Sequence, residues 1–179
     1  MQQPAQSGMN PAAPLARLLD APQRPGLVVW IGLRPVRYRP LVPVATADMD
    51  PEKGLDGDHY RNRVTRARQV TLIQSEQLAA IAAYLGLPQV EPGRLRRNIV
   101  VSGINLLALK GRRFRLGTAV LMHTGECHPC SRMEAEFGPG GYNAVRGHGG
   151  ITARVLSAGR VRLGDPIARD DDPELTTAL

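Results

Sequence analysis

The sequence predicts a mostly β fold: a β-barrel of about seven to nine short strands, with one clear helix and one or two short helices packed outside. The chain holds 19 glycines and 15 prolines among 179 residues. This share is well above average usage and indicates many turns and few long helices. The candidate strands are short apolar runs, and strands and helices do not alternate regularly. That pattern favours a barrel over a doubly wound α/β sheet.

The N-terminal part of the chain divides into a tail, two strands and a long connection. Residues 1–24 are rich in Pro, Ala and Gln and lack periodicity, so we expect a mobile tail. Residues 27–33 (LVVWIGL) have the length and composition of a strand. Residues 40–49 predict a second strand, which its two prolines place at an edge or bulge. Residues 51–68 form a polar connection, and a connection of this length is often functional.

The next stretch contains the clearest helix. Residues 68–73 (RQVTLI) predict a third strand that leads directly into SEQLAAIAAYLG. In this segment Leu78, Ile81, Ala82 and Leu85 share one helical face, with Ser75 as expected N-cap and Gly86 at the C-terminal end. Its apolar stripe predicts that the helix packs on the barrel.

The second half of the chain reads as further short strands and loops. Residues 95–103 contain the buried strand NIVV, and SRMEAEF is expected to form one or two helical turns. We expect a hairpin in residues 106–117, a strand in 118–124, a flexible Gly-rich loop in 140–150 and a closing hairpin of 151–159 with 160–167. The domain therefore spans 25–168, and residues 169–179 form an acidic C-terminal tail.

The charge is uneven along the chain. The net charge is +7, and residues 92–125 carry seven basic side chains and no acidic one. Such a run serves a phosphate-bearing small molecule as readily as a nucleic acid, and a solvated basic face is an equally ordinary explanation. Seven aromatic residues are few for stacking bases.

Cys127 and Cys130 are the two cysteines of the chain, in the segment GECHPCSR. A thiol acts as nucleophile or metal ligand in its thiolate form, which the start of a helical turn and the adjacent Arg132 would favour. Soft thiolate sulfur selects transition metals over Mg or Ca. A structural zinc site, thioredoxin-like exchange through CHPC and two small apolar residues in a bend are the alternatives.

Three further groups of polar residues are candidates for binding. Arg96, Arg97 and Asn98 lie at the start of the strand NIVV, where a guanidinium fork and an amide would face the barrel mouth, although arginines capping a strand are equally common. Asp58 and His59 lie in the long connection. His148 lies among glycines whose backbone amides would approach an anion closely, or which merely turn the chain.

Taken in order, these segments resemble the MOSC domain, the family named for the C-terminal domain of molybdenum cofactor sulfurase, and above all its free-standing bacterial members. The resemblance runs from about residue 27 to 167. It is carried by GLDGDHY, RQVTLIQSEQL, LRRNIVVSGINLLALKGRRFRLGTAVL, GECHPCSRMEA and GHGGITARVLSAGRVRLGD. The resemblance implies a barrel of the MOSC and pyruvate-kinase type.

The resemblance also implies a site. Several family members bind the molybdenum cofactor, a pterin with a dithiolene and a terminal phosphate, and one cysteine ligates the molybdenum. Cys130 matches that cysteine. Arg97 and Asn98 match an Arg-Asn pair that would hold pterin or phosphate, with Asp58 and His59 flanking the same mouth. Arg132 and His148 complete the expected cofactor contacts, Cys127 is a candidate auxiliary thiol, and no pyridoxal phosphate is expected.

Two functions follow from the resemblance. The first is a cytoplasmic oxidoreductase that reduces N-hydroxylated compounds and receives electrons from a separate flavin or iron–sulfur reductase. The second is a sulfur carrier with a persulfide on Cys130, loaded by a donor such as a cysteine desulfurase. A nucleic-acid-binding module is a third interpretation, and we expect neither a nucleic-acid nor a membrane partner. No signal peptide or spanning segment is apparent in the sequence.

Overall fold

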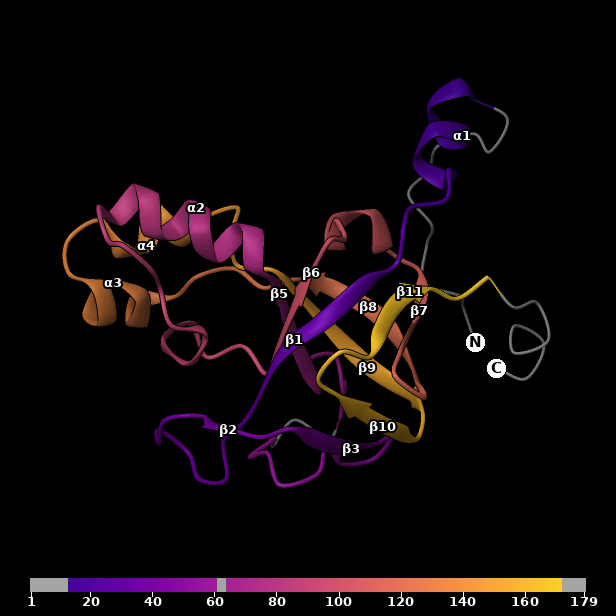
Figure 1. The fold of residues 1–179 in the computed structure, drawn as a ribbon, viewed down its shortest axis with the longest axis horizontal. Helices are drawn as coiled ribbons and strands as arrows, with labels where there is room; N and C mark the ends of the chain where they lie inside the picture. The colour runs from indigo at the N-terminus through magenta and orange to yellow at the C-terminus, as the bar shows by residue number, and fades with distance from the viewer. Residues whose placement is uncertain (1–12, 61–63, 172–179) are drawn as a thin grey trace.

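The computed structural model describes residues 13–60 and 64–171 (Figure 1). Its strands are β1 (Gly26–Leu33), β2 (Val42–Pro43), β3 (Thr46–Asp50), β4 (Gly54–Leu55), β5 (Val70–Gln74), β6 (Ile99–Ser102), β7 (Arg113–Leu116), β8 (Ala119–Glu126), β9 (Ile151–Ser157), β10 (Gly159–Arg162) and β11 (Pro166–Arg169). Its helices are α1 (Pro14–Asp20), α2 (Ser75–Leu85), α3 (Ser131–Phe137) and α4 (Gly141–Val145), with 3₁₀ turns η1 (Pro92–Leu95) and η2 (Leu106–Leu109).

Strands of the described residues close into a seven-stranded barrel, which confirms the predicted fold class. The order is β1-β6-β5-β9-β8-β7-β11, and β11 pairs back onto β1 with Ile167 opposite Gly26. The β5–β6 pair is parallel. Because parallel neighbours need a crossover connection, α2 is placed between them in sequence and outside the barrel in space. β10, β3 and β4 form a separate small sheet.

The core has two parts separated by the barrel wall. Leu72 and Ile99 point into the barrel interior together with residues such as Phe114. Ile73 and Val100, one position further along the same strands, belong to a second cluster that includes side chains from α2, α3 and α4. This alternation is the period of two that a strand imposes. The three helices therefore cover one side of the barrel (Figure 1).

The N-terminal tail is helical where the structure describes it. α1 contains no buried residue, and Asp20 at its end pairs with Arg112 and Arg169. Residues 1–12 and 172–179 lie outside the described residues, so the mobility of both tails stays a prediction. Within the described part of the chain, no helix has the length and apolarity to cross a membrane.

The clearest helix begins where the sequence predicts, with a different cap. Gln74 occupies the N-cap position, and Ser75 is the first helical residue and bonds to Glu76. Gly86 ends the helix in the left-handed conformation, with φ +65°, as predicted. The other carboxylate oxygen of Glu76, Oε1, accepts a hydrogen bond from the Gly103 amide. Glu76 therefore links the start of α2 to the end of β6.

Two predicted hairpins are wrong. Residues 106–109 form η2 instead of a strand, because the Asn105 side chain accepts a hydrogen bond from the Leu107 amide, and Leu106 and Leu109 are both buried. β10 does not pair with β9, whose two edges are already occupied by β8 and β5. It pairs instead with β3, Gly159 opposite Met49. Local turn signals cannot reveal that an edge is taken.

The predicted flexible loop at 140–150 is also wrong, since α4 lies within it. The segment packs tightly at its end. A Cβ built on Gly150, at φ +79°, would lie 1.9 Å from the Leu72 carbonyl oxygen of β5. A Cβ built on Gly147, at φ +83°, would have no described atom within 4 Å of it. Close approach to the barrel therefore requires glycine at 150 but not at 147.

These two glycines give a matched test of that packing. We expect Gly147→Ala to lower the free energy of unfolding by about 1–2 kcal/mol, the cost of a left-handed residue with a side chain. Gly150→Ala should lower it by about 2–5 kcal/mol, because overpacking adds to the same cost. Urea unfolding followed by circular dichroism measures both. Equal losses in the two variants would contradict the tight contact with β5.

Candidate functional site

The cysteine loop, residues 127–130, joins the end of β8 to the start of α3. Cys130 occupies the N-cap position of α3 with an extended backbone, and its carbonyl accepts a hydrogen bond from the Met133 amide. Its side chain is free of any disulfide and exposed to solvent. The structure thus presents the Cys130 thiol at the surface, at the start of a helical turn as the sequence predicts.

Cys127 lies in the opposite environment. It is 1% exposed, and its amide donates to the Gly150 carbonyl at 2.8 Å. Its sulfur accepts a hydrogen bond from the Arg68 guanidinium at 3.3 Å. A thiol that attacks or resolves a neighbour needs access to it, so this burial favours a structural role for Cys127 over that of an auxiliary thiol.

Arg97 is buried, and its guanidinium bonds to the main chain. Three nitrogens donate to the carbonyls of Leu95, Cys127 and Gly149, at 2.7, 3.1 and 2.6 Å. Burial lowers the pKa of Arg97 below its ordinary value, and negative charge at Cys127 opposes that shift. The side chain expected to contact a cofactor therefore holds the backbone around the cysteine loop.

Asn98 is also buried and fully engaged. Its Nδ2 donates to the Gly32 carbonyl and to Asp58 Oδ1, both at 3.2 Å, and its Oδ1 accepts from the Thr71 hydroxyl at 2.8 Å. Asp58 Oδ1 accepts in addition from the Arg34 amide at 2.6 Å. Asn98 and Asp58 thus lie together, as predicted, but they join β1, β5 and β6 at one end of the barrel.

Arg96 belongs to the same polar group as Arg97 and Asn98, but the family resemblance gives it no role. It follows η1 with φ +59°, a conformation that few non-glycine residues adopt. Burial lowers the pKa of Arg96, and the nearby cations Arg34 and Arg132 lower it further, while Asp58 and Cys130 act the other way. The sequence shows two neighbouring arginines but does not say which one points inward.

The loop between β1 and β2 approaches α3 on the same side. The Arg132 guanidinium lies 4.6 Å from the centre of the Tyr38 ring, and Arg37 lies 4.5 Å from it. Arg96 interacts electrostatically with Arg34, with Arg132 and with the exposed Cys130. We call Arg34, Arg96 and Arg132 the cation cluster. Within the described part of the chain, Arg96 and Arg132 have no carboxylate at salt-bridge distance, whereas Arg34 lies 3.7 Å from Asp58.

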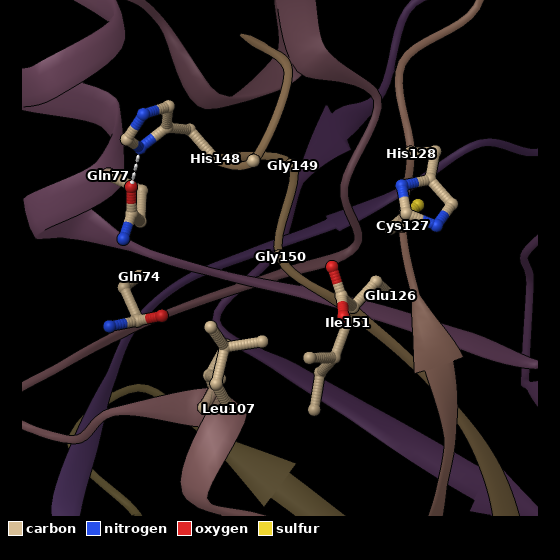
Figure 2. A pocket seen from close by; sticks show the side chains of 12 residues that line it. Gln74, Gln77, Leu107, Glu126, Cys127, His128, His148, Gly149, Gly150 and Ile151 are labelled. Atoms are coloured by element: carbon tan, nitrogen blue, oxygen red, sulfur yellow. Dashed lines mark hydrogen bonds between the residues drawn. The ribbon is translucent and has the colours of Figure 1, made fainter. Parts of the chain in front are cut away.

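The two histidines of the expected site lie apart. The His59 amide donates to the Arg34 carbonyl, and the Arg34 guanidinium donates to the His59 carbonyl. Among the described residues, the buried Nε2 of His59 has no hydrogen-bond partner. His148 lines a pocket between the start of α2, η2, the ends of β5 and β8 and the start of β9 (Figure 2). Figure 2 shows its ring turned toward Gln77 of α2, with which Nδ1 forms a hydrogen bond, and away from Cys127. The structure therefore gathers Asp58, Asn98, Arg132 and Cys130, and it directs His148 elsewhere.

The alternative chemistries of the cysteine segment find little support. The described residues contain no cluster of three or more His, Cys, Asp or Glu able to hold a metal ion. His123 is buried in β8, where its Nδ1 accepts from the Gly111 amide and burial lowers its pKa. α3 is seven residues long and follows an antiparallel barrel strand, unlike the long helix after CxxC in a thioredoxin-like βαβ unit.

Comparison with known proteins agrees with this architecture. The MOSC domain matches residues 58–168. The YuaD protein from Bacillus subtilis has a similar structure, with a TM-score of 0.71 and 22% identity, over 81% of this chain and 95% of that one. YiiM from Escherichia coli superimposes with a TM-score of 0.63 and 18% identity, over 82% and 70% of the two chains.

YiiM from Geobacillus stearothermophilus is similar at a TM-score of 0.61 and 18% identity, over 81% of this chain and 74% of that one. No curated protein matches the sequence. At these identities the structural likeness establishes the fold alone. Because the family match covers more than half of the chain, and the closed barrel is the fold of its structural neighbours, the chain belongs to the MOSC domain family.

Proposed function

We propose that this protein binds the molybdenum cofactor through Cys130 and reduces N-hydroxylated compounds in the cytoplasm. The observation that carries the proposal is an exposed thiol beside the cation cluster, in a family associated with that cofactor. The same observation separates two tasks. The thiol is suited to a soft metal, and the arginines are suited to an anion.

The residues present fit the cofactor. A thiolate sulfur is a ligand that soft transition metals accept. Among residues 13–60 and 64–171, no carboxylate pairs with Arg96 or Arg132, and guanidinium groups bind phosphate through paired N–H donors. Arg97 and Asn98 bond to the protein instead, so we assign the phosphate to Arg96 and Arg132.

When bound, the cofactor would supply two-electron removal of oxygen, in which R–NH–OH, two electrons and two protons give R–NH₂ and water. The chain's own residues hold and orient the anionic groups at the open end of the barrel. Asp58 keeps Arg34 in place there through its backbone amide. The chain has two cysteines, too few to ligate an iron–sulfur cluster, so we propose a separate flavin or iron–sulfur reductase as electron donor.

A second candidate function is sulfur transfer. Cys130 is exposed whereas Cys127 is buried, so one sulfur is accessible both to a sulfur donor and to an acceptor. A persulfide, Cys130–S–SH, would form when a donor persulfide transfers its outer sulfur and is left as the thiol. The cation cluster would stabilise the anionic form of that persulfide.

Molybdenum content separates these functions. We expect about one molybdenum per chain in the wild-type protein made in a host that loads other molybdenum proteins. Cys130→Ser should lose most of it, because the hydroxyl is a poor soft ligand. Cys127→Ser is the control and should stay near wild type, since the serine can still accept from Arg68. Elemental analysis measures all three, and equal near-zero loads would refute the cofactor proposal.

Loss of one guanidinium tests the anion-binding assignment. Arg96→Gln should weaken cofactor retention about tenfold to a hundredfold, the effect of one charge-assisted hydrogen bond to phosphate. Arg94→Gln, which removes a nearby cation that pairs with Glu136, should leave retention unchanged. Molybdenum remaining after dilution and gel filtration gives the ratio. Equal retention in Arg96→Gln and wild type would show that another residue holds the phosphate.

Cyanide-labile sulfur tests the second function. After incubation with a cysteine desulfurase and cysteine, a carrier should hold about one labile sulfur per chain, lost in Cys130→Ser and kept in Cys127→Ser. The sulfur released as thiocyanate is measured by its iron complex. A protein that acquires no labile sulfur under these conditions is not a carrier of this kind.

A further inference from the structure

Arg97 is a buried cation that ties together three separate parts of the chain. Its guanidinium donates to Leu95 in η1, to Cys127 in the cysteine loop and to Gly149 before β9. Among the described residues it has no carboxylate partner. All of its hydrogen bonds therefore go to main-chain carbonyls, and removing the side chain would leave three carbonyl oxygens without their donor.

Burying the charged Arg97 side chain costs free energy that an uncharged side chain would not cost. A buried charge must be compensated by charge-assisted hydrogen bonds, and one guanidinium can reach three carbonyls from a single plane. A lysine ammonium concentrates its donors at one point and cannot span the same three oxygens. The geometry thus requires arginine at position 97.

Both the main chain and the side chain of Cys127 form hydrogen bonds that hold the cysteine loop. The Cys127 amide donates to the Gly150 carbonyl, and the Cys127 sulfur accepts from the Arg68 guanidinium. The contact with Gly149 is close as well, since a Cβ there would lie 2.0 Å from the Cys127 carbonyl oxygen and 3.1 Å from Arg97 Nη2. Three residues further on, Cys130 has no hydrogen bond from its sulfur and is exposed. The path of the main chain from Cys127 therefore decides where the Cys130 thiol stands.

We propose that Arg97 is a positioning residue, which acts through the backbone of the cysteine loop to hold the Cys130 thiol beside the cation cluster. This role differs from contact with a ligand, and it makes the main chain of Cys127 part of the same support. The inference deepens the proposed function but rests only on Cys130 as the reactive thiol, so it can be tested on metal-free protein.

Alkylation of Cys130 at one pH by neutral iodoacetamide and by anionic iodoacetate, followed by mass spectrometry, reports the surroundings of the thiol. Both reagents attack the same thiolate, so the ratio of the two rates does not depend on how much thiolate is present. Arg96 and Arg97 both interact with Cys130, Arg34, Arg132 and Asp58 act on Arg96, and Arg68 acts on Arg97. In Arg97→Lys we expect the ratio of the iodoacetate rate to the iodoacetamide rate to fall about three- to tenfold, because a displaced thiol loses its cations.

Two further variants give the comparison. Arg97→Met should behave like Arg97→Lys, whereas Arg160→Met, which breaks an exposed pair with Asp48 on the small sheet, should match the wild type. A wild-type ratio of alkylation rates in Arg97→Lys together with a lower one in Arg97→Met would mean that charge alone acts, and would overturn the proposal. So would lower melting temperatures with unchanged ratios, or an Arg97→Lys variant that does not fold. None of these outcomes depends on molybdenum, so failure of the cofactor proposal would be seen separately.

Discussion

Pairing of β11 with both β7 and β1 is the constraint on which the rest of the structure depends. It closes the sheet into a ring, so that every barrel strand has both edges paired. Closure removes exposed edges and fixes which side chains of each strand face inward. It also leaves no free edge for β10, which must pair with β3 in a separate sheet. The fold of the later strands follows from this closure more than from local turn chemistry.

The candidate site lies where that ring meets its helical cover. Asn98 connects β6 to β1 and β5 at the barrel end, and Arg97 connects the preceding turn to the cysteine loop. These two buried polar residues satisfy main-chain and side-chain partners from several elements. Because an unpaired buried polar group is costly, such a network has few alternative arrangements. The backbone at Cys127 is therefore tied to the turn before β6 and to the segment before β9.

The surface chemistry depends on what this buried network leaves exposed. Arg97 is turned inward, so its neighbour Arg96 becomes the cation that faces the thiol side. Arg34 and Arg132 come from segments far apart in the chain, the loop after β1 and the start of α3, and meet Arg96 there. Asp58 pairs with Arg34 and offsets part of this charge, and the positive charge that remains would attract an anion. A thiol and a positively charged surface are thus brought together by three different elements.

The sequence by itself determined the fold class, strands such as those in residues 27–33, 68–73 and 118–124, and the helix of SEQLAAIAAYL, because apolar periodicity reports burial directly. Only the tertiary structure decided the pairing of β10, the helix inside the Gly-rich segment and the roles within Arg96-Arg97-Asn98. Those outcomes depend on which strand edges are free and which way a side chain points once distant segments pack. The sequence around Gly149 and Gly150, or around Arg96-Arg97, does not reveal these contacts. The partners lie far along the chain, on β5 and in the cysteine loop. The residue type fixes the chemistry of a side chain, and long-range packing decides whether that side chain points to solvent or into the protein.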